Sequence, residues 1–184
     1  SQAAGKTRSI IMFIGPLAHL FDNFKLPHVG GCKLGLRSIR PHARALKELG
    51  ISIEKHPGAY HITHGKLHGG TIILSEASDT ATENALMAAA KIPDETVIKY
   101  ASANYQVQDL CFFLETLGVS IEGVGTSTLK VRGKKDINEN VVFYPSEDPT
   151  DAMFFIAAAA TTNSSLTITR APIEFLEREL QTLG

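Results

Sequence analysis

The sequence predicts an α/β domain built from three repeats of one helix-and-strand unit. A Leu-Gly pair closes a helical pattern at three places, which lie 68 and 66 positions apart: Leu49-Gly50, Leu117-Gly118 and Leu183-Gly184. The apolar stretches 83–90 and 150–160 are also 66 positions apart when Met87 is matched to Met153. A fixed period of this length is the signature of repeated supersecondary units. We therefore expect one domain over residues 1–184, with units at about 8–69, 70–133 and 140–184.

Within each unit we expect an apolar helix, a strand and an amphipathic helix that ends at glycine, followed by further strands. Glycine suits the end of a helix because it adopts the left-handed conformation at little cost. Alternating apolar and β-branched residues predict the strands. The expected elements are apolar helices at 8–20, 83–90 and 150–160, strands at 96–102 and 165–171, and hairpins at 51–69 and 119–133.

The composition excludes several classes of protein. The chain carries 18 basic and 19 acidic residues, whereas a general nucleic-acid binder normally has a basic excess. Two cysteines do not form a disulfide framework, and no apolar run reaches the length of a membrane span. We expect a protein of the cytoplasm that binds neither nucleic acid nor membrane.

The stretch 26–42, which reads LPHVGGCKLGLRSIRPH, holds the strongest candidate for chemistry. Cys32 follows two glycines, and Lys33, Arg37 and Arg40 come within the next eight positions. Positive charge favours the thiolate, and arginine forks suit phosphate or carboxylate. A reactive thiol at an anion site is one interpretation. A surface turn with a chance cysteine is the other.

The spacing within the units favours the functional interpretation of this stretch. From the helix methionine to the closing glycine there are 31 positions in the second and third units, but 38 from Met12 to Gly50 in the first. The extra residues fall between Asp22 and Cys32. Insertions in repeat folds commonly form functional loops.

The chain also begins in the helix of one unit and stops at the end of a helix in another. Its first unit lacks a leading strand, and its third unit lacks a closing hairpin. We expect either a segment of a longer protein or a permuted arrangement in which the two ends complete each other.

Three motifs together resemble a known family. The sequences GGCKLGLR, ATENALMAA and DLCFFLETLGVSIEGVGTSTLKVRG are similar to those of the UDP-N-acetylglucosamine 1-carboxyvinyltransferases, which are enolpyruvyl transferases. The resemblance covers the chain from Arg8 onward. It implies an inside-out α/β barrel domain of βαβαββ repeats, with the active site in the cleft to a second domain of the same enzyme. It also implies the substrates UDP-N-acetylglucosamine and phosphoenolpyruvate, and neither a metal nor an organic cofactor.

The resemblance assigns roles to individual residues. Cys32 matches the loop cysteine that donates a proton to the enolpyruvyl group and reacts with fosfomycin. Arg8 and Arg37 match arginines that bind the anionic substrates. Two further stretches match the backbone segments around the uridine nucleotide: Arg37, Ser38, Ile39, Arg40 and Pro41, and then Glu76, Ala77, Ser78 and Asp79.

The chain departs from the family pattern at the nucleotide segments. Arg40 stands where an aspartate is usual, Glu76 replaces a lysine, and Ser78-Asp79-Thr80 replaces Ser-Val-Gly. The alternatives are therefore a transferase with another acceptor, such as shikimate 3-phosphate, and a diverged binding domain without catalysis. The loop cysteine argues against the shikimate enzyme, which does not depend on one.

Two other features favour structural interpretations. His61, His64 and His68 suggest a metal site, but strand spacing directs His61 and His64 to opposite faces. Cys111 lies in an apolar stretch, which predicts a buried, inert thiol.

Overall fold

The computed structural model describes residues 7–28 and 38–183. The chain divides into two compact units, Ser1–Val141 and Val142–Gly184. The second unit begins close to the predicted start of the third repeat. The grouping of all three repeats into one domain stays a prediction.

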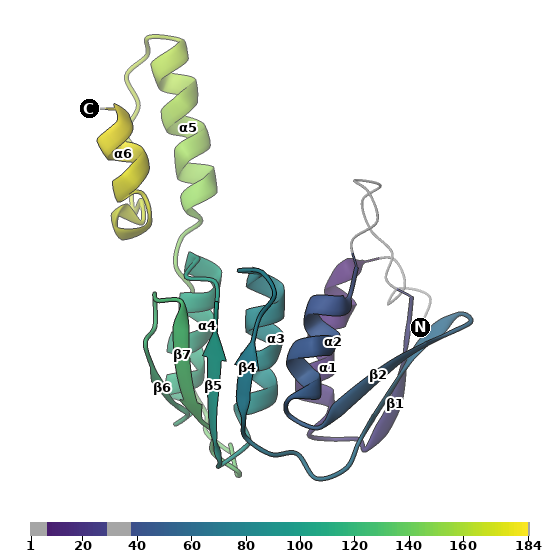
Figure 1. The fold of residues 1–184 in the computed structure, drawn as a ribbon. Coiled ribbons are helices and arrows are strands. Elements are labelled where there is room, and N and C mark those ends of the chain that lie inside the picture. The colour runs from purple at the N-terminus through teal and green to yellow at the C-terminus, as the bar shows by residue number, and fades with distance from the viewer. Residues whose placement is uncertain (1–6, 29–37, 184) are drawn as a thin grey trace. The chain divides into compact units, whose positions relative to one another are not determined.

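The first unit contains two sheets and the helices that cover them (Figure 1). A three-stranded antiparallel sheet has the order β1-β3-β2, and a four-stranded sheet has the order β4-β5-β7-β6. In the second sheet β4 and β5 are parallel, whereas β5-β7 and β7-β6 are antiparallel. The elements are η1 (Arg8–Phe13), α1 (Ile14–Leu17), β1 (Asn23–Pro27), α2 (Arg40–Lys47), β2 (Ile51–His56), β3 (Ala59–His64), β4 (Thr71–Ile73), α3 (Asp79–Ala89), β5 (Glu95–Lys99), α4 (Tyr105–Thr116), β6 (Ser120–Glu122) and β7 (Thr128–Arg132).

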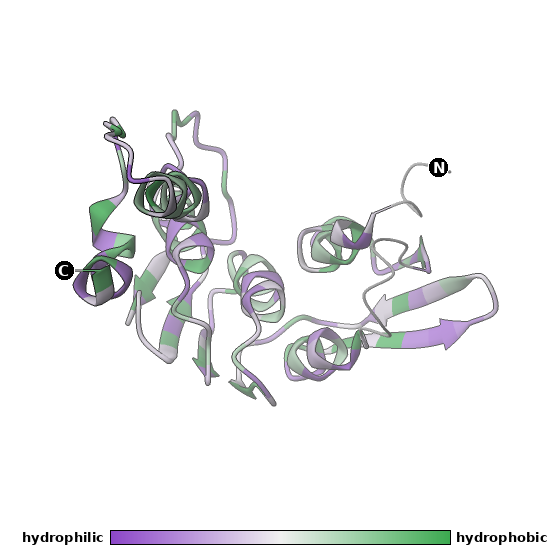
Figure 2. Cartoon of the chain, turned by 90° about the horizontal axis from the view of Figure 1, so that it is seen from above, coloured by the Kyte–Doolittle hydropathy of each residue, from purple (hydrophilic) through white to green (hydrophobic). Residues whose placement is uncertain are grey.

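Most of the expected elements of the first two repeats are present. The hairpins β2-β3 and β6-β7 lie within the predicted ranges. Burial alternates along β3 and β7, whereas β2 ends in three polar residues, Glu54, Lys55 and His56, which form the hydrophilic end of that strand in Figure 2. Gly50 and Gly118 follow α2 and α4 with φ of +91° and +87°, which confirms the predicted left-handed helix ends. The predicted strand 96–102 is shorter in the structure, because β5 ends at Lys99 and Tyr100 has a positive φ.

The second unit is helical. It contains α5 (Pro149–Thr161), η2 (Ile173–Phe175) and α6 (Glu177–Leu183), and α5 includes the predicted apolar helix. The prediction of a strand at 165–171 is wrong, because this segment joins α5 to η2 without strand structure. A strand needs a neighbour for its backbone hydrogen bonds, and the described part of this unit offers no other strand.

Helix α3 is the centre of the first unit, where it contacts α1, α2 and α4. Small residues on α3 allow this close approach, because Ala81, Ala85 and Ala88 are all fully buried. Large apolar side chains fill the space around them, and each contributes roughly 1.5–3 kcal/mol when fully buried. The largest of these fully buried side chains include Ile14, Leu46, Leu49, Ile51, Ile62, Ile72, Leu86 and Ile98.

One buried amide, that of Asn84 on α3, joins three helical segments. Its Nδ2 donates to the carbonyl oxygen of Ile11 at 2.9 Å and to Nδ1 of His42 at 3.2 Å. Its Oδ1 accepts from the backbone N–H of Gly15 at 2.8 Å. Thr80 Oγ1 lies 3.4 Å from the other ring nitrogen of His42. We refer to Asn84, His42 and their partners Ile11, Gly15 and Thr80 as the Asn84 network.

Gly15 leaves no room for a side chain in this network. A Cβ at this position would lie 2.6 Å from the carbonyl oxygen of Asn84 and 2.9 Å from the backbone nitrogen of Ala88. We expect Gly15→Ala to lower the free energy of unfolding by about 1–3 kcal/mol, as overpacked cores do. Urea denaturation measures the change.

Gly65→Ala is the matched control, because a Cβ added at Gly65 would meet nothing within 4 Å. The control is expected to change stability by less than about 1 kcal/mol. Equal effects of the two substitutions would contradict the packing that we describe around Gly15.

His42 makes the stability of the first unit sensitive to acid. Burial, followed by the charge of Arg8, lowers the pKa of His42 to about 4. The unfolded chain therefore binds this proton more readily, so stability is lost as the pH falls from about 6.5 to about 4. Only neutral imidazole can accept the hydrogen bond from Asn84. We expect this residue to account for a loss of about 3 kcal/mol across that range.

The test is urea denaturation at several pH values between 7 and 4 for the wild-type protein and for His42→Gln. The glutamine variant carries no titrating group at this position, so its stability should fall less steeply. His68→Gln removes an exposed histidine and is the control for the loss of one imidazole. If the free energy of unfolding falls equally steeply with pH in the wild type and in His42→Gln, His42 is not the source of the acid sensitivity.

Candidate active site

The predicted nucleotide segments lie at the starts of two neighbouring helices. Ser38 to Pro41 lead into α2, and Glu76 to Asp79 lead into α3. The Asn84 network holds these helices together, because His42 on the first turn of α2 contacts Thr80 and Asn84 on α3. The structure thus brings both segments to neighbouring positions, although they are 38 residues apart in the sequence.

Arg8 lies at the first of these segments. Its guanidinium Nη2 donates to the carbonyl oxygen of Ser38 at 3.1 Å. The hydroxyl of Ser38 in turn accepts from the backbone N–H of Arg40 at 3.0 Å, which fixes the turn before α2. Arg8 also contributes to the lowered pKa of His42, after burial. The positive charge of Arg8 therefore reaches the start of α2.

Cys32 and Arg37 lie outside the described residues, which resume at Ser38. The flanking residues are well anchored. The His28 ring lies 4.9 Å from the ring of Tyr60, and Arg8 binds Ser38 as described above.

Asp79 has a structural role that the sequence did not reveal. One carboxylate oxygen accepts from the hydroxyl of Ser102 at 2.5 Å, and the other accepts from Nδ2 of Asn104 at 3.1 Å. Ser78 caps α3 by accepting from the N–H of Ala81. Asp79 also suits the first turn of α3, where the helix dipole favours negative charge. Its carboxylate is therefore bound within the protein, and the segment 76–79 is tied to the turn at 102–104.

Ser102 and Asn104 belong to the candidate site although sequence reasoning missed them. They follow β5, as Ser75 to Ser78 follow β4, and β4 and β5 are parallel. The carboxyl ends of parallel strands meet at one edge of a sheet, where ligands commonly bind. The Ser-x-Asn spacing after a strand was the available signal.

Charge is unevenly distributed over the two segments. Arg40 and Glu76 are both exposed, whereas Ser78 and Asp79 are half-buried. Burial, and then the charge of Asp79, raises the pKa of Glu83 one turn further along α3. A ligand at this edge therefore meets the exposed Arg40 at the start of α2 and the exposed Glu76 just before α3.

The histidines of the β2-β3 hairpin make contacts other than metal coordination. The His61 ring stacks on that of His56 with a centroid distance of 4.0 Å, and the ring nitrogens of His64 lie near the carbonyl oxygens of Gly65 and Phe21. The described part of the chain contains no group of three or more His, Cys, Asp or Glu side chains placed to hold a metal ion. Across residues 7–28 and 38–183, no helix is long and apolar enough to cross a membrane.

Cys111 is the buried thiol that the sequence predicts. It is 0% exposed on α4. Burial, and then the charge of Glu115, raises the pKa of this thiol to about 12. It stays protonated at neutral pH, which confirms the interpretation of Cys111 as structural.

The contacts of Asp79 predict a measurable stability cost on its removal. Asp79→Ala leaves the partly buried hydroxyl of Ser102 and the amide of Asn104 without their acceptor, so unfolding should become easier by about 1–3 kcal/mol. Glu76→Ala, at an exposed position of the same segment, is the control and should stay within about 0.5 kcal/mol of the wild type. Chemical denaturation of both variants measures this, and a neutral Asp79→Ala would contradict the assigned role.

Several curated proteins are similar to this chain over most of its length. UDP-N-acetylglucosamine 1-carboxyvinyltransferase 2 of Clostridium tetani is 37% identical over 166 residues, which are 90% of this chain and 40% of that protein. UDP-N-acetylglucosamine 1-carboxyvinyltransferase of Treponema denticola is 40% identical over 166 residues, which are 90% of this chain and 38% of that protein. The chain thus spans about two fifths of the length of these relatives.

A solved structure supports the fold. The chain matches the enolpyruvyl transferase NikO of Streptomyces tendae with a TM-score of 0.63 and 18% identity, over 81% of this chain and 36% of that one. This likeness confirms the predicted enolpyruvyl transferase fold.

The family model described as EPSP synthase (3-phosphoshikimate 1-carboxyvinyltransferase) matches residues 3–183, which is nearly the whole chain. Together with the relatives above, this match confirms the resemblance seen in the sequence motifs. The chain belongs to this family of carboxyvinyltransferases.

Proposed function

We propose that the protein carrying this chain transfers the enolpyruvyl group of phosphoenolpyruvate to the 3-hydroxyl of UDP-N-acetylglucosamine and releases phosphate. The observation that carries the proposal is the 37–40% identity, over 90% of the chain, to proteins named UDP-N-acetylglucosamine 1-carboxyvinyltransferase. The reaction would serve peptidoglycan precursor synthesis in the cytoplasm. The chain would contribute three repeats of one domain, and a second domain would complete the active site.

Cys32 would be the general acid in this reaction. The acceptor hydroxyl oxygen forms a bond to C2 of phosphoenolpyruvate while the thiol of Cys32 gives its proton to C3, which becomes a methyl group. The hydroxyl proton passes to a base of the second domain. The bond from C2 to the phosphate oxygen then breaks and phosphate leaves with the electron pair. A proton of C3 returns to the Cys32 thiolate, which restores both the double bond and the thiol.

The arginines would stabilise the charge of the substrates and of the leaving phosphate. Arg8 is anchored on the Ser38 carbonyl, and Arg37 directly precedes that serine. Cations that the protein already holds in position stabilise developing negative charge well, because no groups have to reorganise during the reaction. The segments Ser38 to Pro41 and Glu76 to Asp79 would bind the nucleotide of the acceptor, the second of them mainly through its backbone, because the Asp79 carboxylate already accepts two hydrogen bonds.

The decisive experiment compares the two cysteines in the full-length gene product. With both substrates supplied, Cys32→Ser should lower the rate of phosphate release by about a hundredfold or more, since general acid catalysis contributes this much. Cys111→Ser is the control, because that thiol is buried and protonated at neutral pH. Equal turnover of Cys32→Ser and the wild type would disprove the role of Cys32.

The same assay tests the acceptor. Phosphate release with shikimate 3-phosphate, and none with UDP-N-acetylglucosamine, would assign the chain to a transferase with another acceptor. Absence of turnover with both acceptors, together with absence of saturable nucleotide binding, would indicate a domain without catalysis.

A further inference from the structure

Tyr100 is an exposed aromatic residue at the end of β5, and its backbone is in an unfavourable conformation. Its φ is +57°, in the left-handed region that bulky side chains rarely adopt. Its side chain is 64% exposed. Both features are unusual for a tyrosine next to a central strand, because aromatic side chains normally contribute to stability through burial.

The positive φ is what turns the ring toward solvent. Along β5, Thr96 and Ile98 are 0% exposed, whereas Lys99 is exposed. The period of two along a strand would therefore direct Tyr100 inward. The strand instead ends at Lys99, the backbone changes conformation at Tyr100, and Ala101 and Ser102 become buried in its place. The N–H of Ala101 donates to the carbonyl oxygen of Ser127 at 3.0 Å, which holds the new direction of the chain.

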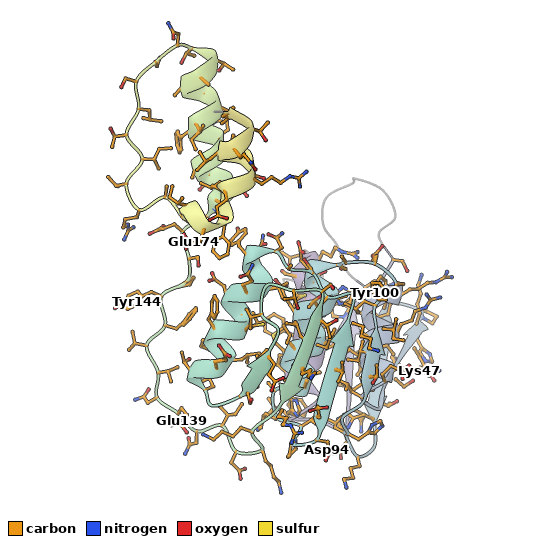
Figure 3. All side chains as sticks on the ribbon, turned by 60° about the vertical axis from the view of Figure 1, so that its left-hand side comes forward. Lys47, Asp94, Tyr100, Glu139, Tyr144 and Glu174 are labelled. Carbon is orange, nitrogen blue, oxygen red and sulfur yellow. The ribbon has the colours of Figure 1, made fainter. Side chains whose placement is uncertain are left out.

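Tyr100 lies next to the predicted nucleotide segment. The parallel pairing places Ile73 opposite Lys99, and the N–H of Leu74 donates to the carbonyl oxygen of Lys99 at 3.1 Å. Tyr100 is therefore beside Leu74, two residues before Glu76. Figure 3 labels Asp94 and Tyr100 at opposite ends of β5, with Tyr100 at the end where the strand leads into the candidate site. Two residues further on, Ser102 binds Asp79 itself.

We propose that Tyr100 stacks on the nucleobase of the acceptor and is a specificity-determining residue of the nucleotide site. The inference rests on the proposed function and adds a residue that the family resemblance does not assign. A tyrosine ring offers a rigid planar face to a base, and such stacking contributes substantially to nucleotide affinity. The ring of Tyr100 also offers an apolar surface beside two nucleotide segments that carry the charged residues Arg40, Glu76 and Asp79.

The test uses the full-length protein and titration with UDP by calorimetry. Tyr100→Asn removes the ring and places at this position a residue that tolerates the left-handed conformation. We expect its Kd for UDP to rise about tenfold and its thermal midpoint to stay equal or rise. Tyr100→Phe keeps the ring and should bind UDP like the wild type.

Tyr144→Asn is the matched control, because it likewise removes an exposed tyrosine ring, with Tyr144 86% exposed. Its UDP affinity should equal that of the wild type. Unchanged UDP affinity in Tyr100→Asn would overturn the proposal, and so would weaker binding of UDP-N-acetylglucosamine with unchanged binding of UDP, since the ring would then contact the sugar. A lower thermal midpoint with unchanged affinity would also overturn it, by assigning Tyr100 to a protein contact.

The two proposals fail in distinguishable ways. If the wild-type protein neither binds UDP nor releases phosphate, the proposed function fails and the role of Tyr100 fails with it. If the wild type is active and Tyr100→Asn binds UDP equally well, only the role of Tyr100 fails.

Discussion

The buried amide of Asn84 is the contact on which the arrangement of the first unit depends. It is 0% exposed, and it links the carbonyl of Ile11, the N–H of Gly15 and the ring of His42 to one position on α3. An unsatisfied polar group at this depth would cost stability, so the three helical segments are held in one register. The same contacts hold the candidate site in position, because its residues precede or begin these helical segments.

The residues of the candidate site are therefore positioned by contacts that lie on the same helical segments. Arg8 precedes the segment with Ile11, the Ser38 turn precedes α2 with His42, and Glu76 precedes α3 with Asn84. A second set of contacts, from Asp79 to Ser102 and Asn104, joins the two turns that follow the parallel strands β4 and β5. Precise binding requires that rigid elements and supporting contacts hold the side chains of the site in position.

Local chemistry made much of this fold predictable. Gly50 and Gly118 end their helices as their sequence context indicates, and the alternating residues of both hairpins form strands. The prediction of a strand at 165–171 is wrong, because alternating residues indicate only that one side of a segment can be buried. They do not show that a neighbouring strand is present to pair with it. Sequence reasoning missed the roles of His42, Ser102 and Asn104, because each role depends on a contact 23 to 42 residues away in the sequence.

The contacts of Asp79 restrict how this site can be exchanged with that of a relative. A valine, the residue that the family resemblance implies at this position, would offer no acceptor to Ser102 or Asn104. A graft of the 76–79 segment alone would leave two donors without a partner, one of them on a side chain that is only 7% exposed. Positions 79, 102 and 104 therefore form one transferable unit, and engineered chimaeras that carry all three should be more stable than grafts of the 76–79 segment alone.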